Sequence, residues 1–506
     1  MTNKYLLGVD IGTYSSKGVL VSEDGKIAAM HVVEHGLEMP KPGYFEHDAD
    51  KVWWHDFVEI CHQILKTSNI NPKDVLAVGT SAIGSCVLPI DKDGNALRPG
   101  ILYGIDTRAS AEIDELNQIL GKDNIFNSNG SYLTSQASGP KILWIRNNEP
   151  EIYEKTRYFL TSEAYLVYKL TNKASIDIYT AGGYSPLFDP IKKEWIAERG
   201  KYITPIENLP DIYLPGEIVG NVTKDAAVIT GLAEGTPVIA GTTDAAAEAV
   251  SAGVSQVGDM MVMFGSSIFF ILKSARLIRT TKFWSSNFVE PGSFAFLGGM
   301  STSGSLTRWF RDQLGQPEMD RENAGGENAY AALAKLAATS AKGANGLIAL
   351  PYFEGERTPL HDPHACGMFF GLSLKHTRAD LYRAILESVA YGIRHNLEGM
   401  RNEGVEAERI LAVGGGTKNQ EWMRIVSDVA GIKMGIPKQQ IGASYGDAFM
   451  AGIGAGVFAN YTEIHQWVEI GQEIEPDYTA HEVYDLNYSI FRELYDQTAY
   501  LMHKLR

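Results

Sequence analysis

Residues Leu6 to Val21 read LLGVDIGTYSSKGVLV, and the architecture of the whole chain can be built outward from them. They form an apolar strand, a polar turn of small residues and a second apolar strand, the pattern of a β-hairpin with a polar tip. A second segment, MMVMFGSSIFFIL from Met260 to Leu272, repeats this plan around a Gly-Ser-Ser turn. Two such hairpins in one chain indicate a duplicated fold.

Apolar strands that end in glycine-rich turns recur elsewhere, as VLAVGTSA (Val75 to Ala82), PVIAGTTDA (Pro237 to Ala245) and ILAVGGG (Ile410 to Gly416). Each is followed by helix-like sequence, and this alternation predicts α/β domains. Ligands of such sheets bind beyond the carboxyl ends of the strands. Asp10, Asp244 and the three glycines 414–416 fall at such ends, so we expect the chemistry to gather there.

A chain of 506 residues is too long for one ordinary core, so we expect two large domains. Because the second hairpin begins soon after Asp244, the predicted domains are residues 1–246 and 247–506. Apolar residues at every third and fourth position predict helices from Ala379 to Met400 and from Asn419 to Ala430. The Glu-, Asn- and Gly-rich stretch Asp320 to Asn328 predicts a solvated loop.

Charge and composition exclude several kinds of partner. A formal net charge of −16 argues against nucleic acid and against an anionic membrane surface, since both select basic patches. The three cysteines lie far apart with no CxxC spacing, which suits a reducing compartment and gives no metal site. No stretch of about twenty uncharged apolar residues occurs, so we expect a cytoplasmic protein without a membrane segment.

The polar tip of the first hairpin supplies a carboxylate, backbone amides, hydroxyls and one cation, a set that phosphate and magnesium both require. Gly12 lets the backbone approach a phosphate, Thr13 and Ser15 offer hydroxyls, Lys17 neutralises charge, and Asp10 is a magnesium ligand through water. A plain hairpin with a polar cap is an equally good interpretation of this motif alone.

A second phosphate clamp is predicted at Gly265 and Ser266, in the turn of the second hairpin. Two clamps facing each other imply a cleft between the domains. The triple glycine 414–416 leads into the helix that starts near Asn419, so backbone can pass close to an anionic or flat ligand there. On this motif alone, a tight strand-to-helix turn is the better interpretation of the glycines. Neither the dinucleotide fingerprint nor GxxxxGK[ST] is present in context.

Asp244 follows the strand PVIAGTT and precedes a run of small residues, so its carboxylate projects from a strand end. This is where a general base for phosphoryl transfer to a hydroxyl belongs, because the carboxylate accepts the hydroxyl proton as the bond to phosphorus forms. An aspartate before Ala-Ala-Ala-Glu also fits a helix cap, and the local sequence leaves both interpretations open.

Taken in order along nearly the whole chain, these motifs resemble the FGGY family of carbohydrate kinases. GVDIGTYSSKGVLV resembles the first phosphate hairpin of the family, and PGYFEHDADKVW the segment that follows it in xylulokinase-like members. KILWIRNN, Lys141 to Asn148, matches the K-x-x-W core of the first family signature, although Gln136 departs from its usual first position. Residues Gly367 to Glu387, including GLSLKHTRADLYRAILE, fit the second signature.

The resemblance implies two ribonuclease-H-like domains of the sugar kinase, chaperone and actin superfamily, which close over ATP, Mg²⁺ and a small sugar in an interdomain catalytic cleft. Residues 1–246 would bind the sugar and residues 247–506 the nucleotide. Carried over by position, the resemblance implies Asp244 as the catalytic base and Asp10 as the residue at the magnesium. It implies that the transferred phosphate is contacted by Gly12, Thr13, Ser15 and Lys17, with Gly265 and Ser266 as the second clamp. It implies that Gly304 forms the wall beside the nucleotide and that Gly415 and Asn419 contact the adenosine.

The sugar pocket departs from the well-known members of the family. Where glycerol kinases carry Arg-Glu and typical xylulokinases Met-His, the segment GTSAIGSC places Gly84 and Ser85, which disfavours glycerol. Arg108 is either a further substrate contact or half of a structural ion pair. The candidate substrate contacts are Ser85, Tyr103, Asp106 and Gln136, together with Asp244.

The predicted function is ATP-dependent phosphorylation of a hydroxyl on a small sugar, with D-xylulose or a related ketopentose first. The alternatives are another polyol or a sugar acid (a tetritol, a pentitol or a gluconate-like acid), or a non-catalytic protein of the ATPase fold. Family members are often dimers or tetramers; the resemblance therefore allows a homodimer, and nothing in the sequence fixes a symmetry.

Overall fold

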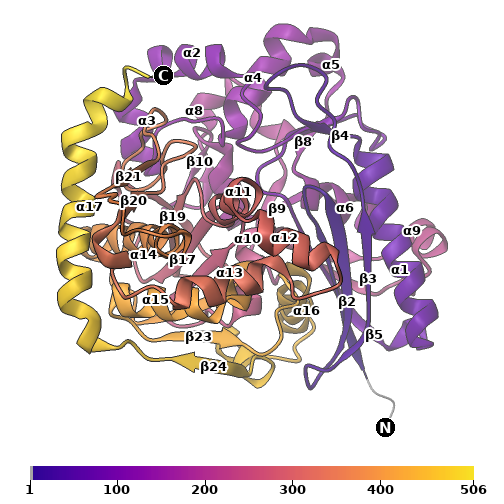
Figure 1. Cartoon of the computed structure of the whole chain (residues 1–506). Coiled ribbons are helices and arrows are strands. Elements are labelled where there is room, and N and C mark those ends of the chain that lie inside the picture. Colours follow the sequence, from indigo (N-terminus) through magenta and orange to yellow (C-terminus); the bar gives the residue numbers. More distant parts are fainter. Residues whose placement is uncertain (1–3, 506) are drawn as a thin grey trace.

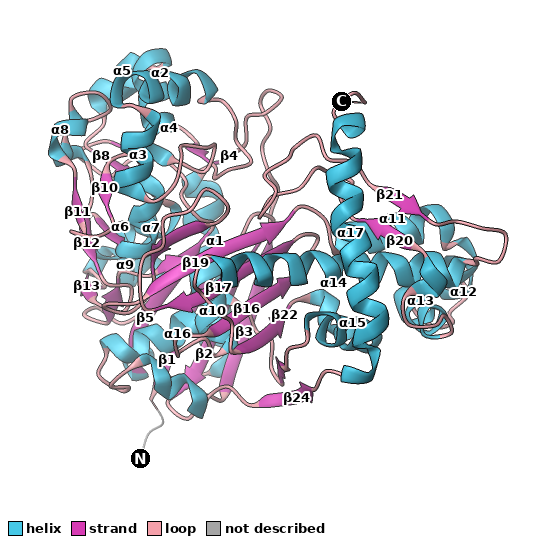
Figure 2. Cartoon of the chain, turned by 90° about the vertical axis from the view of Figure 1, so that its left-hand side faces the viewer, coloured by secondary structure: helices cyan, strands magenta, loops and turns pink. Residues whose placement is uncertain are grey.

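The computed structural model describes residues 4–505. The chain forms two α/β halves, each built on a mixed β-sheet (Figure 1). In that view the N-terminal half, drawn indigo to magenta, lies at the right and top, and the C-terminal half, orange to yellow, lies at the left. Figure 2 shows the two sheets at the centre of the molecule, with helices packed around them.

The first sheet is organised around the hairpin predicted at residues 6–21. Strands β1 and β2 pair antiparallel with Asp10 opposite Lys17, and the Gly12 N–H closes the tip by donating to the Ser15 carbonyl at 3.0 Å. The strand order is β13-β14-β5-β1-β2-β3, with β15 also paired to β5. The strands are β1 (Tyr5–Ile11), β2 (Ser15–Ser22), β3 (Ile27–Glu34), β5 (Val75–Ala82), β13 (Ile218–Asn221), β14 (Pro237–Ile239) and β15 (Thr242–Thr243).

The second sheet contains the second predicted hairpin. Strands β16 and β17 pair antiparallel, and the Gly265 N–H donates to the Ser267 carbonyl at 3.0 Å across the tip. The strand order is β18-β19-β17-β16-β22-β23-β24. The strands are β16 (Asp259–Phe264), β17 (Ile268–Ser274), β18 (Trp284–Asn287), β19 (Phe294–Met300), β22 (Arg409–Val413), β23 (Met434–Pro437) and β24 (Ile470–Ile474).

The two sheets share one topology. In the first, β3, β2 and β1 are antiparallel and are followed by the parallel strands β5 and β14. In the second, β19, β17 and β16 are antiparallel and are followed by the parallel strands β22 and β23. The duplication predicted from the two hairpins is therefore confirmed.

Seventeen α-helices connect and cover the strands within residues 4–505. The first half contains α1 (His55–Ser68), α2 (Ser110–Leu120), α3 (Lys122–Asn129), α4 (Ser138–Asn148), α5 (Pro150–Lys155), α6 (Ser162–Thr171), α7 (Ile178–Ala181), α8 (Ala197–Gly200), α9 (Lys224–Thr230) and α10 (Asp244–Ala252). The second half contains α11 (Gly304–Leu314), α12 (Gln316–Asn323), α13 (Ala329–Ala338), α14 (Arg378–Asn402), α15 (Gln420–Ala430), α16 (Ala443–Gly454) and α17 (His481–Met502).

Short strands form small two-stranded sheets outside the main ones. These are β4 (Glu46–His47) with β7 (Gly100–Ile101), β6 (Leu88–Ile90) with β8 (Tyr158–Leu160), β9 (Ser175–Asp177) with β12 (Asp211–Tyr213), β10 (Phe188–Asp189) with β11 (Glu194–Trp195), and β20 (Ile348–Leu350) with β21 (Met368–Phe370).

The helices predicted from periodicity are confirmed as α14 and α15. The loop predicted from Asp320 to Asn328 is wrong in its first part, because α12 runs on to Asn323. That helix carries a proline in its first turn, where a missing N–H costs nothing, and its Glu318 pairs with Arg378 at the start of α14 at 2.8 Å. Tertiary contact therefore extends a helix that the local composition disfavours.

Helix α16 ties the two halves together. It belongs to the C-terminal half, yet it packs on β1 and β5 of the first sheet and on α10. Glycines allow the close approach: a Cβ on Gly8 would lie 1.9 Å from the Ser444 carbonyl oxygen, and one on Gly446 would lie 2.1 Å from that of Ala247. Apolar residues of both halves accordingly share one buried cluster around α10 and α16. The predicted domain boundary at residue 246 lies inside α10 and stays a prediction.

None of the helices described within residues 4–505 combines the length and the apolar character needed to cross a membrane.

Candidate active site

Carboxylates converge where β1, β5 and β15 end. Asp10 is the penultimate residue of β1, and Asp244 is the first residue of α10, directly after β15. The Ser81 hydroxyl, on β5, contacts Asp10 Oδ1 at 2.9 Å and Asp447 Oδ2, from α16, at 2.7 Å. One hydroxyl hydrogen serves one acceptor at a time, so one carboxyl of this pair carries a proton when no cation is bound.

The raised pKa values of this carboxylate cluster reflect burial first and the crowding of like charges second. Burial and the charge of Asp244 raise the pKa of Asp10 well above its usual range. Burial raises the pKa of Asp244 to about 6. Burial and the charge of Asp10 raise the pKa of Asp447, and burial raises that of Glu248 to about 7 against the opposing charge of Lys17. Strongly shifted carboxyl groups at the ends of strands are typical of functional sites.

The cluster fits a magnesium ion that is shared with a substrate. Asp447 is fully buried, and its Oδ1 has no hydrogen-bond partner within residues 4–505. In the same part of the chain, no three His, Cys, Asp or Glu residues come together as a complete metal site. Magnesium keeps several waters and binds proteins through one or two carboxylates plus substrate phosphates. Asp10 and Asp447, which share the Ser81 hydroxyl, supply the one or two carboxylates that such a magnesium ion needs.

Lys17 links the first hairpin to the C-terminal half. Its ammonium donates to the Ile441 carbonyl at 2.8 Å. The adjacent Gln440 accepts from the Gly414 N–H at 3.0 Å, and its amide nitrogen donates to the Thr417 hydroxyl at 3.0 Å. The segment at 440–441 therefore brings the tip of the first hairpin and the glycine turn 414–416 to one region of the molecule.

The second hairpin lies against the glycine turn. Cβ atoms on Gly414 and Gly416 would lie 2.7 Å from the carbonyl oxygen and 2.8 Å from the Cβ of Phe264, the last residue of β16. At Gly304, a Cβ would lie 2.6 Å from the Gly265 carbonyl oxygen. These glycines permit close packing of backbone on backbone. Gly415 differs, because a Cβ there would meet no atom within 4 Å among the described residues, so this glycine faces open space.

Three other predicted nucleotide contacts have definite places in the structure. Ser15 is exposed at the first hairpin tip. Ser266 is exposed at the second tip, and its carbonyl accepts from the Ser303 N–H at 2.9 Å, which anchors the start of α11. Asn419 caps α15 by accepting from the Trp422 N–H at 3.0 Å. Its amide group remains oriented by that cap beside the glycine turn.

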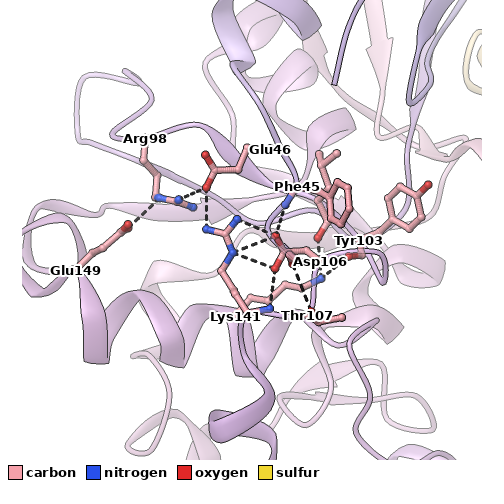
Figure 3. A network of polar contacts seen from close by, with 11 residues as sticks. Phe45, Glu46, Arg98, Tyr103, Asp106, Thr107, Lys141 and Glu149 are labelled. Atoms are coloured by element: carbon pink, nitrogen blue, oxygen red, sulfur yellow. Dashed lines mark hydrogen bonds and ion pairs between the residues drawn. The ribbon is translucent and has the colours of Figure 1, made fainter. Parts of the chain in front are cut away.

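Tyr103 connects the predicted sugar pocket to the first hairpin. Its hydroxyl lies 3.2 Å from the Thr13 hydroxyl. The backbone that carries it is fixed by the buried Lys141, whose ammonium donates to the carbonyls of Leu102 at 2.7 Å and Tyr103 at 2.9 Å (Figure 3). Burial lowers the pKa of Lys141 to about 8. Lys141, the lysine of the first signature, therefore fixes the backbone at Leu102 and Tyr103.

Ser85 and Gln136 lie on neighbouring turns. Ser85 has a φ of 43°, a left-handed conformation that is uncommon for serine, and a Cβ on Gly183 would lie 1.8 Å from its hydroxyl oxygen. Gln136 is exposed and accepts from the Gly104 N–H at 3.1 Å, next to Tyr103. Both side chains are thus placed by close contact with a glycine.

Asp106 does not fit the predicted role of a substrate contact. It is fully buried, and its oxygens accept from the Phe45 N–H at 2.7 Å and from the Arg108 guanidinium at 2.7 Å (Figure 3). Arg108 also pairs with Glu46 at 2.7 Å and lies over the Tyr44 ring at 4.3 Å. The structural alternative for Arg108 is therefore the one observed, and Asp106 belongs to that ion pair.

Four residues of this region carry no signal in the sequence. Ser81 and Asp447 join the carboxylates through tertiary contacts between β5 and α16, and Glu248 lies one helical turn after Asp244. Burial raises the pKa of the Tyr179 hydroxyl, and the negative charge of Asp244 raises it further. Each sits in an ordinary helical or strand pattern, so nothing short of the fold identifies it.

Comparison with known proteins defines the class. A xylulose kinase of Staphylococcus epidermidis is 29% identical over 510 residues, covering 99% of this chain and 98% of that protein. A ribulokinase of Geobacillus thermodenitrificans is 29% identical over 490 residues, covering 90% and 86%. The solved structure of a xylulose kinase from Rhodospirillum rubrum matches with a TM-score of 0.90 at 30% identity, covering 99% of this chain and 100% of that one. The fold is therefore that of the two-domain sugar kinases.

Two family models identify the family itself. The N-terminal domain of the FGGY family of carbohydrate kinases matches residues 5–251, and its C-terminal domain matches residues 260–455. The chain belongs to the FGGY family of carbohydrate kinases, which confirms the resemblance and the enzyme class, a phosphotransferase with an alcohol group as acceptor.

Proposed function

We propose that this chain transfers the γ-phosphoryl group of ATP to a hydroxyl of a small ketose, with D-xylulose or a related ketopentose as the first candidate. The observation that carries the proposal is the place of Asp244, whose charge acts directly on Asp10 where two strands end. A candidate base thus lies beside a candidate magnesium carboxylate. Relatives named xylulose kinase that align over nearly the whole chain support the choice of acceptor.

Asp244 is the proposed catalytic base. It accepts the Ala245 N–H at 2.7 Å, which fixes the carboxylate at the first turn of α10. A carboxylate within hydrogen-bond reach of the acceptor hydroxyl takes up its proton as the bond to phosphorus forms. Burial, which raises the pKa of Asp244 to about 6, makes it a stronger base than an ordinary aspartate.

The phosphates and magnesium are assigned to the two hairpin tips. Asp10 would hold Mg²⁺, which neutralises charge on the phosphate oxygens. The residues proposed to contact phosphate are Gly12, Thr13, Ser15 and Lys17 in the first tip and Gly265 and Ser266 in the second. Main-chain amides and a lysine ammonium at such tips stabilise the charge that develops on the transferred group.

The adenosine is assigned to Gly415 and Asn419, with Gly304 as the adjoining wall, and the sugar to Ser85, Tyr103 and Gln136. Sugar binding then belongs to residues 1–246 and nucleotide binding to 247–506. A cytoplasmic location and a homodimer remain part of the proposal.

A panel of acceptors tests this function. ATP consumption with magnesium is measured against ketopentoses, aldoses, tetritols, pentitols and sugar acids, with a control lacking sugar. We expect the highest kcat/KM with D-xylulose or another ketopentose. A sugar acid or polyol as the best acceptor would overturn the substrate assignment alone. ATP hydrolysis that no acceptor stimulates would overturn the kinase itself and favour a non-catalytic protein of the same fold.

The pH dependence of turnover follows from the state of Asp244. A general base acts only when deprotonated, so kcat/KM for the sugar should be high at neutral pH and fall as the pH drops through about 6. A pH–rate profile of kcat/KM, taken within the range where the protein stays folded, measures this limb. A profile that stays flat from about pH 8 to about pH 5 would contradict the assignment.

Gly415→Val should weaken nucleotide binding. The glycine Cα faces open space, where the valine side chain would occupy the volume proposed for adenosine. We expect the Kd for MgADP, measured by calorimetry, to rise about tenfold or more, a typical cost of steric exclusion from a binding site. Gly36→Ala is the control, because Gly36 also has no neighbouring atom in reach and does not have a left-handed φ. An unchanged Kd for Gly415→Val would show that adenosine binds elsewhere.

A further inference from the structure

Two buried side chains, His35 and Asp56, support the tip of the first hairpin through hydrogen bonds. The His35 Nδ1 lies 2.7 Å from Asp56 Oδ2, and the Ser16 hydroxyl donates to the same carboxylate oxygen at 2.7 Å. The other ring nitrogen of His35, Nε2, lies 3.2 Å from the Gly12 carbonyl oxygen. The side chains of His35 and Asp56 are only 7% and 3% exposed, so this chain of bonds is shielded from water.

The bond to Gly12 fixes the direction of the next amide. The peptide between Gly12 and Thr13 is planar, and in a trans peptide the C=O and N–H point to opposite sides. With the carbonyl turned toward His35, the Thr13 N–H points away from it. That N–H meets no acceptor among residues 4–505, although the Thr13 hydroxyl is engaged with Tyr103. A backbone donor left open at a hairpin tip is available to an anionic ligand.

The ring of His35 faces an acceptor at each nitrogen, a carboxylate on one side and a carbonyl on the other. A carbonyl oxygen only accepts, so a hydrogen bond to Gly12 requires a hydrogen on Nε2. Burial raises the pKa of Asp56, but the hydrogen bonds from His35, Ser16 and His55 outweigh burial and lower it overall. The Asp56 carboxylate therefore holds the ring at its Nδ1 side, beneath the phosphate hairpin.

A second imidazole nearby does not compete for this role. The ring of His47 lies edge-on to His35 at 5.2 Å between centroids, and its Nδ1 accepts from the Trp53 indole at 3.1 Å. Burial and the neighbouring His35 lower the pKa of His47 to about 4, with the backbone of Thr13 and the charge of Asp56 acting in the opposite sense. The imidazole of His47 is therefore uncharged at neutral pH, and it packs against His35.

We propose that His35, held by Asp56, is a positioning residue that sets the Gly12–Thr13 peptide so that the Thr13 N–H is presented to a phosphate of the nucleotide. This inference rests on the proposed function, because it needs a phosphate at the first hairpin tip. It assigns to these two side chains an effect on the nucleotide and none on the sugar.

The test compares His35→Leu with His35→Gln. Leucine removes the donor at similar volume, whereas glutamine keeps an N–H within reach of the Gly12 carbonyl. We expect the leucine variant to raise the Kd for Mg²⁺-AMP-PNP, a non-hydrolysable ATP analogue that keeps all three phosphates, and the KM for ATP about tenfold, with the KM for D-xylulose unchanged, because an oriented amide to a phosphate is a charge-assisted bond. Glutamine should restore affinity to within about threefold of the wild type. Calorimetry with Mg²⁺-AMP-PNP gives the binding readout without turnover.

His62→Ala is the matched control. His62 Nε2 also lies at hydrogen-bond distance from a backbone carbonyl, that of Ile229 at 2.8 Å, but it belongs to the exposed face of α1. We expect its affinity for Mg²⁺-AMP-PNP to be unchanged. If His35→Leu fails to fold, Asp56→Asn takes its place, since it removes the charge that holds the ring and should weaken Mg²⁺-AMP-PNP binding severalfold.

Each outcome has a distinct meaning. Mg²⁺-AMP-PNP affinity that is unchanged in a folded His35→Leu variant, or lowered equally with the affinity for sugar, overturns the inference and leaves the proposed function intact. A wild-type protein that binds no nucleotide overturns both. A selective loss of nucleotide affinity that glutamine restores supports the role of His35.

Discussion

Asp244→Asn should lower kcat for phosphoryl transfer about 10³-fold while the Kd for MgADP stays within about threefold of the wild-type value. Asparagine keeps an oxygen that can accept the Ala245 N–H, so the start of α10 is retained. What disappears is the carboxylate that accepts the proton of the sugar hydroxyl. Steady-state kinetics with the best acceptor, together with calorimetry for MgADP, separate the chemical step from binding.

The control for this variant is Asp225→Asn, which changes an exposed aspartate in the first turn of α9. It should behave as the wild type in both measurements. Substantial turnover in Asp244→Asn would show that another group accepts the proton, and Asp10 and Glu248 would be the next residues to examine, since both interact electrostatically with Asp244. A parallel loss of MgADP affinity would instead indicate that Asp244 supports the nucleotide site.

Gly8→Ala should destabilise the protein by about 3 kcal/mol or prevent folding, the largest effect on stability that we expect from one added methyl group. Gly8 lies in the middle of β1, and its added Cβ would lie 1.9 Å from the Ser444 carbonyl oxygen and 2.6 Å from the Ala448 nitrogen in α16. Both neighbours are backbone atoms of a buried helix, so the helix must move away from the sheet. The melting temperature from calorimetry measures the cost.

Gly36→Ala serves as the control, because no atom lies within 4 Å of the position of its Cβ in the described structure. Its melting temperature should change little, as for most surface substitutions. A melting temperature of Gly8→Ala equal to that of the wild type would show that α16 does not pack on β1 as described. Loss of activity at normal stability would instead point to a small shift of Asp447 on the same helix.

The local pattern of the chain was enough to predict the elements that carry the chemistry. Both hairpins and the strand at Val75 to Ala82 follow from short apolar runs that end in turns of small residues, and the long helix α14 follows from apolar residues at every third and fourth position. Glycines at the turns placed the two tips and the triple-glycine turn correctly. Asp10 and Asp244 could be singled out because each lies at the end of a buried strand, and strand ends are where ligands of such sheets bind.

The local sequence could not predict which side chains pair with one another. Asp106 follows the same kind of apolar segment as the other candidates, yet its carboxylate is taken up by Arg108 and the Phe45 N–H. Conversely, His35 stands in an exposed-looking stretch after β3, and its contact with Gly12 depends on how β3 leaves the sheet. A polar side chain in sequence shows only what it is able to bind, and its neighbours decide whether that capacity is already used.

The duplicated strand plan, the hairpin tips and the candidate base and magnesium carboxylate are properties of the local sequence, because a strand, a turn and the exposed end of a strand each need only a few consecutive residues. The contacts of Asp447 with Ser81, of Lys17 with Ile441 and of His35 with Gly12 are decided by the tertiary structure. They join residues far apart along the chain, and in the first two cases they exist only because helix α16 and the segment before it return from the C-terminal half to pack on the first sheet.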